Sequence, residues 1–171
     1  MFRVVWLASL VGLPILSSVA SAQRRTHPDE PAPQAGAITV TIAAKVGGKD
    51  YQASGPGSCQ HAPDASIRGA SASLWTVQYS GAGKGELKQL NLTLWRLKDT
   101  DSDQLSLSLE TGSKSHRIET GEGESVGEGT VTILPSGPGG RLEVSGRDGK
   151  GKKIQVTIDC SAFGDVAAEG D

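Results

Sequence analysis

The densest group of chemically active side chains in the sequence is acidic, and its spacing imitates a calcium-binding loop. Asp99, Asp101 and Asp103 alternate along the chain, and Glu110 follows eleven residues after the first of them. Carboxylate oxygens at this spacing bind Ca²⁺ in loops that helices flank. In this chain Gln104 occupies the position of the turn glycine, and a predicted strand follows it. We therefore predict a solvated acidic turn without a metal, and calcium binding at the three aspartates is the alternative.

Histidine could supply acid–base chemistry. His61 precedes Asp64 by three residues, and a carboxylate at this distance could orient an imidazole in a hydrolase. No serine is surrounded by the glycine pattern of a nucleophilic serine. We predict instead that residues 61–64 form a turn, in which Asp64 bonds nearby backbone. His116 alternates with Ile118, and we predict it on a strand surface. The sequence favours a protein that is not an enzyme, with a serine-type or metal-dependent hydrolase as the alternative.

Trp95 is the best single candidate for a binding residue. Leucines alternate from Leu90 to Leu94 and predict the buried face of a strand. Asn91, Thr93 and Trp95 then lie on the outward face. An outward tryptophan among polar side chains can stack on a sugar ring or hold a partner. We predict these three residues as a ligand site; a covering layer or loop, or a bulge that reverses the phase, is the alternative.

Alternating apolar residues recur along the chain and predict short strands. The alternating runs are Ile38 to Ile42, Trp75 to Tyr79, Leu90 to Leu94, Leu105 to Leu109, Val131 to Ile133, Leu142 to Val144 and Ile154 to Ile158. Glycine, proline and aspartate clusters separate them and predict turns, among them Gly47-Gly48 and Gly55-Pro56-Gly57. We predict an all-β, mainly antiparallel β-sandwich of about seven to ten strands, with Trp75 in its core.

The N-terminal residues are typical of a cleavable export signal. Arg3 precedes a short apolar run, and Ala20-Ser21-Ala22 fits a cleavage site. We predict that residues 1–22 are removed and that no transmembrane segment remains, because the run is too short to span a bilayer.

The rest of the exported chain divides into three predicted parts. Residues 23–36 are rich in proline and predict a disordered tether. Residues 37–163 hold the alternating runs and predict the β-sandwich domain, and residues 164–171 predict a flexible acidic tail.

Cysteine content and charge limit the function classes. Cys59 and Cys160 are the only cysteines, and in an exported chain two cysteines most simply form one disulfide. Redox pairs usually lie closer together, and a zinc site usually needs four ligands. The formal net charge is −2, which gives no long-range attraction to nucleic acid. We predict neither a nucleic-acid partner nor a cofactor.

The glycines and alternating residues at the two ends of the predicted domain follow a family pattern. The matching segments are Gly48-Lys49-Asp50 with Gly55 and Cys59, and Gly127-x-Gly129, Gly140, Leu142-x-Val144-x-Gly146 and Ile154-x-Val156-Thr157-x-x-Cys160. They resemble the mycobacterial small lipoprotein antigens, the nineteen-kilodalton antigen family. The resemblance implies a compact envelope β-sandwich without enzymatic activity and a bond between Cys59 and Cys160. Gln23 stands where that family has its lipidation cysteine, so acyl anchoring is not expected.

These features together predict a secreted or periplasmic binding or interaction module at a bacterial cell envelope. The sequence does not identify the ligand, and an envelope lipid, a glycan or a protein would each suit an outward tryptophan. A purely structural, antigen-like surface protein is the alternative function.

Overall fold

The computed structural model describes residues 37–81, 87–100, 102–121 and 125–166, and every regular element in these ranges is a β-strand. The strands are β1 (Thr39–Val46), β2 (Lys49–Ile67), β3 (Ala70–Ser80), β4 (Leu87–Leu97), β5 (Asp103–Thr111), β6 (Lys114–Glu119), β7 (Glu128–Ser136), β8 (Gly139–Arg147), β9 (Lys153–Cys160) and β10 (Gly164–Asp165). The predicted signal peptide and tether, residues 1–36, lie outside the described residues. Within the described ranges no helix is long and apolar enough to cross a membrane.

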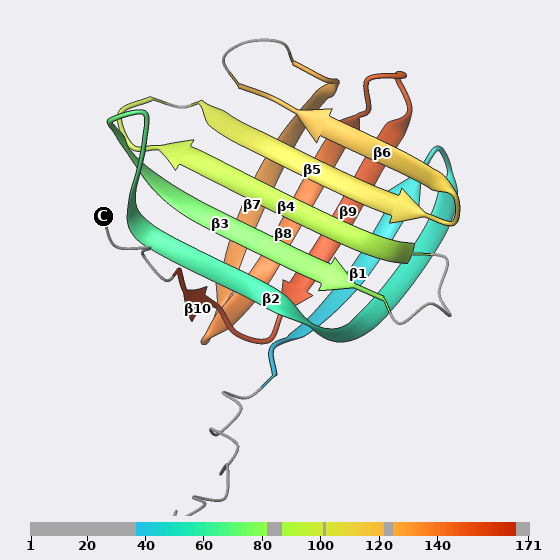
Figure 1. Cartoon of the computed structure of the whole chain (residues 1–171), viewed down its shortest axis with the longest axis horizontal. Helices are drawn as coiled ribbons and strands as arrows, with labels where there is room; N and C mark the ends of the chain where they lie inside the picture. The colour runs from blue at the N-terminus through green and yellow to red at the C-terminus, as the bar shows by residue number, and fades with distance from the viewer. Residues whose placement is uncertain (1–36, 82–86, 101, 122–124, 167–171) are drawn as a thin grey trace, which may run out of the picture. The chain divides into compact units, whose positions relative to one another are not determined.

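The strands pair in the order β6-β5-β4-β3-β2-β1-β9-β8-β7. Every pair along this path is antiparallel, and β10 adds a short parallel pair with β2. Figure 1 shows the strands in two layers. We call the second half of β2 with β3 to β6 the front layer, and the first half of β2 with β1, β9, β8 and β7 the rear layer. The predicted all-β, mainly antiparallel fold is confirmed.

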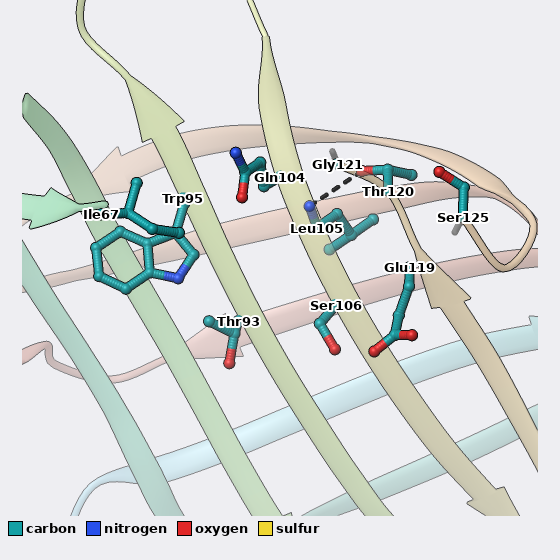
Figure 2. A pocket seen from close by; sticks show the side chains of 10 residues that line it. All are labelled: Ile67, Thr93, Trp95, Gln104, Leu105, Ser106, Glu119, Thr120, Gly121 and Ser125. Atoms are coloured by element: carbon teal, nitrogen blue, oxygen red, sulfur yellow. Dashed lines mark hydrogen bonds between the residues drawn. The ribbon is translucent and has the colours of Figure 1, made fainter. Parts of the chain in front are cut away.

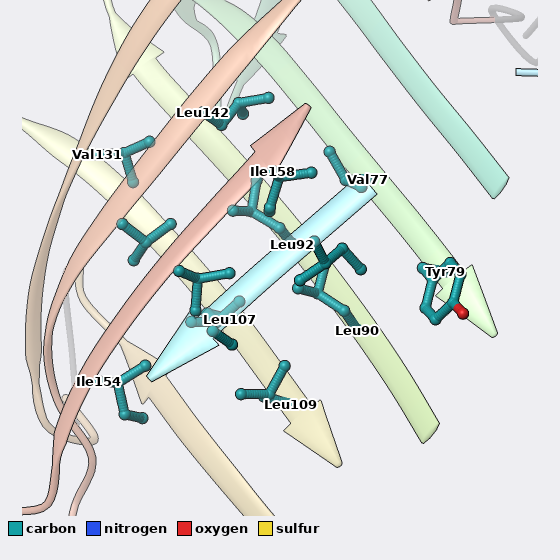
Figure 3. Packing of buried hydrophobic residues seen from close by; sticks show 14 of the residues in the cluster. Val77, Tyr79, Leu90, Leu92, Leu107, Leu109, Val131, Leu142, Ile154 and Ile158 are labelled. Atoms are coloured by element: carbon teal, nitrogen blue, oxygen red, sulfur yellow. The ribbon is translucent and has the colours of Figure 1, made fainter. Parts of the chain in front are cut away.

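The core lies between the two layers and consists of the alternating apolar residues of both. The largest fully buried side chains are Ile42, Leu87, Leu90, Leu92, Leu94, Leu105, Leu107, Leu109, Ile118, Leu142, Ile154 and Ile158. Figure 3 shows side chains from both layers in this cluster. Each such side chain stabilises the fold by roughly 1.5 to 3 kcal/mol relative to an exposed one. Trp75 packs against the cluster and remains half-buried, so its predicted inward direction is confirmed.

β2 belongs to both layers. Its first half, up to Pro56, pairs with β1, and its second half, from Gly57, pairs with β3. The sequence predicts a turn at Gly55-Pro56-Gly57, and this prediction is wrong, because these residues lie inside a continuous strand that bends between the layers (Figure 1). The bend requires glycine: a Cβ on Gly57 would lie 2.6 Å from Val40 Cγ2 and 2.7 Å from the Gln78 carbonyl oxygen.

The turn predicted at residues 61–64 is also wrong, because these residues continue β2. The pairing with β3 passes through them with a register shift between Ala62 and Ala65. A β-bulge of this kind accommodates extra residues without ending the strand. Asp64 bonds a side chain rather than nearby backbone, since it accepts a hydrogen bond from Lys98 Nζ at 2.6 Å.

The predicted disulfide between Cys59 and Cys160 is present. Cys59 lies on β2 in the front layer and Cys160 ends β9 in the rear layer, with 6.2 Å between their Cα atoms. Both residues are buried. The bond therefore joins the two layers across the core and links residues 101 positions apart in the sequence.

The segment after β9 is more ordered than the sequence predicts. The prediction of a flexible tail at residues 164–171 is wrong for the first residues of this range, because β10 pairs with Gln60 and His61 of β2. Phe163 precedes β10, and its ring lies edge-on to the His61 ring with 6.3 Å between the centroids. This aromatic contact and the backbone pairing hold the segment against the front layer. Residues 167–171 lie outside the described residues.

We expect the double variant Cys59→Ala/Cys160→Ala to be less stable than the wild type. A cross-link over so long a segment restricts the unfolded chain, and its loss should lower the free energy of unfolding by about 2 to 5 kcal/mol. Urea unfolding followed by circular dichroism measures the change. The wild type, reduced while unfolded and then refolded with reductant, is the matched control and should have the same lowered stability. An unchanged unfolding midpoint in the double variant would contradict the prediction.

A second prediction concerns the bend in β2. Gly57→Ala should lower the free energy of unfolding by about 1 to 3 kcal/mol, because the added methyl group overpacks the contact with Val40. Gly55→Ala is the control, since its methyl group would meet Tyr79 at 3.6 Å, an ordinary contact distance. Thermal unfolding of both variants under the same conditions tests the difference. Equal melting temperatures would show that the bend tolerates a side chain at position 57.

Candidate functional site

Trp95 lies on the outer face of the front layer. β4 buries its alternate leucines in the core and directs Asn91, Thr93 and Trp95 to the other side, where each is half-buried. The burial pattern alternates without interruption from Leu90 to Trp95, so no bulge reverses the phase in this stretch. The outward direction that the sequence predicts for these residues is therefore correct.

An open cavity of about 270 Å³ lies beside Trp95 (Figure 2). Its lining residues are Ile67, Thr93, Trp95, Gln104, Leu105, Ser106, Glu119, Thr120, Gly121 and Ser125. They come from the end of β2, from β4, β5 and β6, and from the segment that follows β6. Several strands thus contribute side chains to one site.

Cross-strand pairing determines what surrounds the indole. Trp95 pairs with Leu74 of β3 on one side and with Gln104 of β5 on the other. In the adjacent row Thr93 pairs with Ser106. Because paired residues of an antiparallel sheet point to the same face, the indole lies between an apolar and an amide side chain, and hydroxyl groups follow it.

Hydrogen bonds hold the wall of the cavity near β6. The Leu105 backbone N–H donates to Thr120 Oγ1 at 3.0 Å (Figure 2), and the Thr120 hydroxyl donates to the Asp103 carbonyl oxygen at 3.4 Å. Arg117 forms an ion pair with the Glu119 carboxylate. A ligand would therefore meet polar groups that are already positioned, which lowers the entropy lost on binding.

Three other cavities lie on the outer face of the rear layer, and each contains an ion pair. Their volumes are about 430, 410 and 320 Å³. The ion pairs are Arg141–Asp159, Arg147–Glu128 and Lys45–Asp50, in the same order. The rear-layer cavities are thus marked by paired charges, whereas the Trp95 cavity combines an aromatic ring with hydroxyl groups, one amide and the carboxylate of Glu119.

Two of the three residues predicted for binding line the cavity. Trp95 and Thr93 do so, whereas Asn91 lies one row further along β4. The sequence analysis missed Gln104 and Glu119, which lie on β5 and β6. Alternation marks Gln104 as outward, because Leu105 beside it is buried, but it does not show which strand lies next to β4.

His61 lies on the inner side of the front layer, stacked on Trp75. The two ring centroids are 4.5 Å apart and the planes differ by 10°. His61 Nε2 is buried without a hydrogen-bond partner among the described residues, and burial lowers the pKa of this imidazole. Asp64 is bonded to Lys98 instead, so the structure does not bring together the His61–Asp64 pair considered for a hydrolase.

The acidic cluster is divided in the structure. Arg96 donates through Nε and Nη2 to both carboxylate oxygens of Asp103, at 2.9 and 2.8 Å. Asp99 is exposed after β4, and Asp101 lies outside the described residues. Among the residues that the structure describes, no group of three or more acidic, histidine or cysteine side chains could hold a metal ion.

His116 is buried, so its predicted place on the strand surface is wrong. Its Nδ1 lies 3.0 Å from Asp148 Oδ2, and both side chains are about nine-tenths buried or more. The backbone N–H groups of Lys150 and Lys152 donate to the other Asp148 oxygen at 3.0 and 2.9 Å. A buried carboxylate that satisfies the imidazole explains why His116 faces the core together with Ile118.

Comparison of the chain with models of known protein families, with curated proteins and with solved structures finds no match. The site is therefore interpreted from its own geometry and chemistry. The resemblance of the two ends of the domain to the small lipoprotein antigens stays a prediction.

We expect Asp148 to stabilise the fold at neutral pH and to lose this effect in acid. Burial by itself raises the pKa of Asp148, but hydrogen bonds from His116 and from two backbone N–H groups outweigh it, so the pKa lies below its ordinary value of 3.8. A carboxyl whose pKa is lowered in the folded state stabilises the fold at pH values above its pKa in the unfolded chain. This stabilisation is lost as the pH falls through the pKa of the folded state.

Asp148→Asn should therefore lower the free energy of unfolding by about 1 to 3 kcal/mol at pH 7. The difference from the wild type should shrink as the pH falls below about 4. Urea unfolding at several pH values tests this, with the exposed Asp159→Asn variant as a control that should change stability by about 1 kcal/mol or less. A difference that does not vary with pH would contradict the prediction.

Proposed function

We propose that the chain is an exported, non-enzymatic binding module of the bacterial cell envelope, and that its ligand binds around Trp95. The observation that carries this proposal is the position of the indole. It lies half-buried on an outward sheet face, beside an open cavity and among polar side chains. Tryptophan offers a large apolar surface and one N–H donor, which is why it is enriched among residues that anchor ligands.

The functional groups of the cavity suit binding. Its lining supplies hydroxyl groups, one amide and one carboxylate, and no histidine, cysteine or lysine is among the lining residues. Nucleophilic catalysis needs a base within hydrogen-bond reach of the nucleophile. His61 and His116 both lie on the inner side of the front layer, and Trp95 lies on the outer side.

The side chains of the site stand on paired strands, which favours recognition. Trp95, Gln104 and Glu119 stand on neighbouring strands whose opposite sides pack into the core. Sites on strands hold their side chains more precisely than sites on loops. The Cys59–Cys160 bond adds a covalent link between the layers.

Two features support export to an envelope compartment. The first residues have the charged start, apolar run and cleavage site of a secretory signal. Disulfides form and persist in oxidising compartments such as the periplasm and the cell exterior. The resemblance to the small lipoprotein antigens favours the same location.

Trp95→Ala should weaken ligand binding about tenfold or more, because aromatic anchors contribute a large part of the binding energy. Isothermal titration calorimetry with envelope lipids and oligosaccharides measures the effect without relying on the indole as reporter, and Trp95→Phe should retain part of the affinity. Leu134→Ala is the matched control, since Leu134 is an exposed apolar side chain on the rear layer. A titration in which every variant responds alike, or none responds, would favour the purely structural function.

A further inference from the structure

We infer that the Trp95 site binds a neutral glycan, and this inference rests on the binding function proposed above. One sugar ring stacks its C–H face on the indole of Trp95. The ring hydroxyls bond to the side chains of Thr93, Gln104, Ser106 and Glu119, all of which line the same cavity.

The first reason is that the sheet face around Trp95 is uncharged over β2 to β5, and that the charges where these rows reach β6 form an ion pair, Arg117–Glu119. Three cross-strand rows run over β2 to β5 through Asn91, Thr93 and Trp95. From β2 to β5, the row through Asn91 consists of Ser58, Gln78, Asn91 and Ser108. The row through Thr93 consists of Gln60, Thr76, Thr93 and Ser106, and the row through Trp95 consists of Ala62, Leu74, Trp95 and Gln104. The outer face of the rear layer carries several ion pairs. In the front layer the Arg117–Glu119 and Lys98–Asp64 pairs lie outside these positions of β2 to β5.

The second reason is the kind of polar group in these rows. Amide and hydroxyl side chains each donate and accept hydrogen bonds, so they can match sugar hydroxyls in either orientation. Within one row the Thr76 hydroxyl donates to Gln60 Oε1 at 3.1 Å. Because neighbouring strands are about 4.8 Å apart, a ligand that lies across β4, β5 and β6 meets a new polar side chain at each such step.

Other ligand classes fit the site less well. An acyl chain needs a deep apolar cavity, whereas this cavity is open and mixes Ile67, Trp95 and Leu105 with polar residues. An anionic ligand needs cations, and none lines the cavity. A protein partner would be favoured by a broad apolar patch, but among the described residues the exposed large apolar side chain is Leu134, on the rear layer.

Glu119 selects against acidic sugars. Its carboxylate is about one-third exposed and can accept hydrogen bonds from two adjacent hydroxyls of one ring. Arg117 already pairs with this carboxylate and leaves little net positive charge for an anion. A uronic acid or phosphate at this point would have to compete with the Glu119 carboxylate for Arg117, which disfavours binding.

Affinity electrophoresis of the exported chain tests the inference. Native gels contain a neutral polysaccharide (hydroxyethylcellulose, galactomannan or a soluble β-glucan) or the acidic polygalacturonate. We expect at least one neutral polymer to retard the wild type, and Trp95→Ala and Gln104→Ala to lose about tenfold or more in affinity. Leu134→Ala should migrate like the wild type. Glu119→Gln should keep neutral-glycan binding within a few-fold and reduce the discrimination against polygalacturonate. Melting temperatures of all variants establish that each is folded.

Each outcome distinguishes the glycan inference from the proposed binding function. Stronger retardation by polygalacturonate than by every neutral polymer, lost in Trp95→Ala, would overturn the neutral-glycan inference and support the site. No retardation by any polysaccharide, together with co-sedimentation with phosphatidylglycerol or phosphatidylcholine vesicles that is lost in Trp95→Ala, would also overturn the neutral-glycan inference and support the site. If no probe responds in a way that depends on Trp95, both proposals fail.

Discussion

The fold depends on β2 remaining one hydrogen-bonded strand while it passes from the rear layer to the front layer. Its pairing with β1 ends at Pro56, and its pairing with β3 begins at the next residue. Two local features fix the position of β2 where it bends from one layer to the other. Gly57 has no side chain, so Val40 can pack directly against the bend, and Cys59 is bonded to β9 only two residues later. Because no loop separates the layers at this point, the front layer is held over the core by continuous backbone and by the disulfide.

The two outer faces of the domain differ in the kind of polar side chain that they expose to water. On the rear layer, cations and carboxylates lie near one another and neutralise each other, as in Arg141–Asp159. On the front layer, the rows around Trp95 contain amides and hydroxyls without charge over β2 to β5. Neutral polar groups lose less on desolvation than charged groups do. A ligand can therefore cover these rows of β2 to β5 at a smaller free-energy cost than it could cover the charged face of the rear layer.

The sequence predicts the direction of a side chain better than it predicts its neighbours. Alternation placed Trp95 outward correctly, but Gln104 and Glu119 reach the site through pairings that no local pattern encodes. The glycine–proline–glycine segment of β2 is typical of a turn, and only tertiary packing makes it a strand. The alternating stretch with Ile118 predicts His116 on the strand surface, whereas its buried partner, Asp148, lies thirty-two residues away in the sequence. Fold class, core phase and disulfide were thus predictable, whereas the composition of the site was not.

The place of β9 in the sheet has a consequence for how the chain is made. β9 lies between β1 and β8, so the first strand of the domain lacks one neighbour until the last long strand is available. Cys160 ends that same strand, and the covalent closure waits for it as well. Pairings between distant parts of a sequence form slowly. For a chain exported as we propose, the rear layer therefore stays incomplete during passage through the membrane and closes only after nearly the whole domain has arrived on the oxidising side.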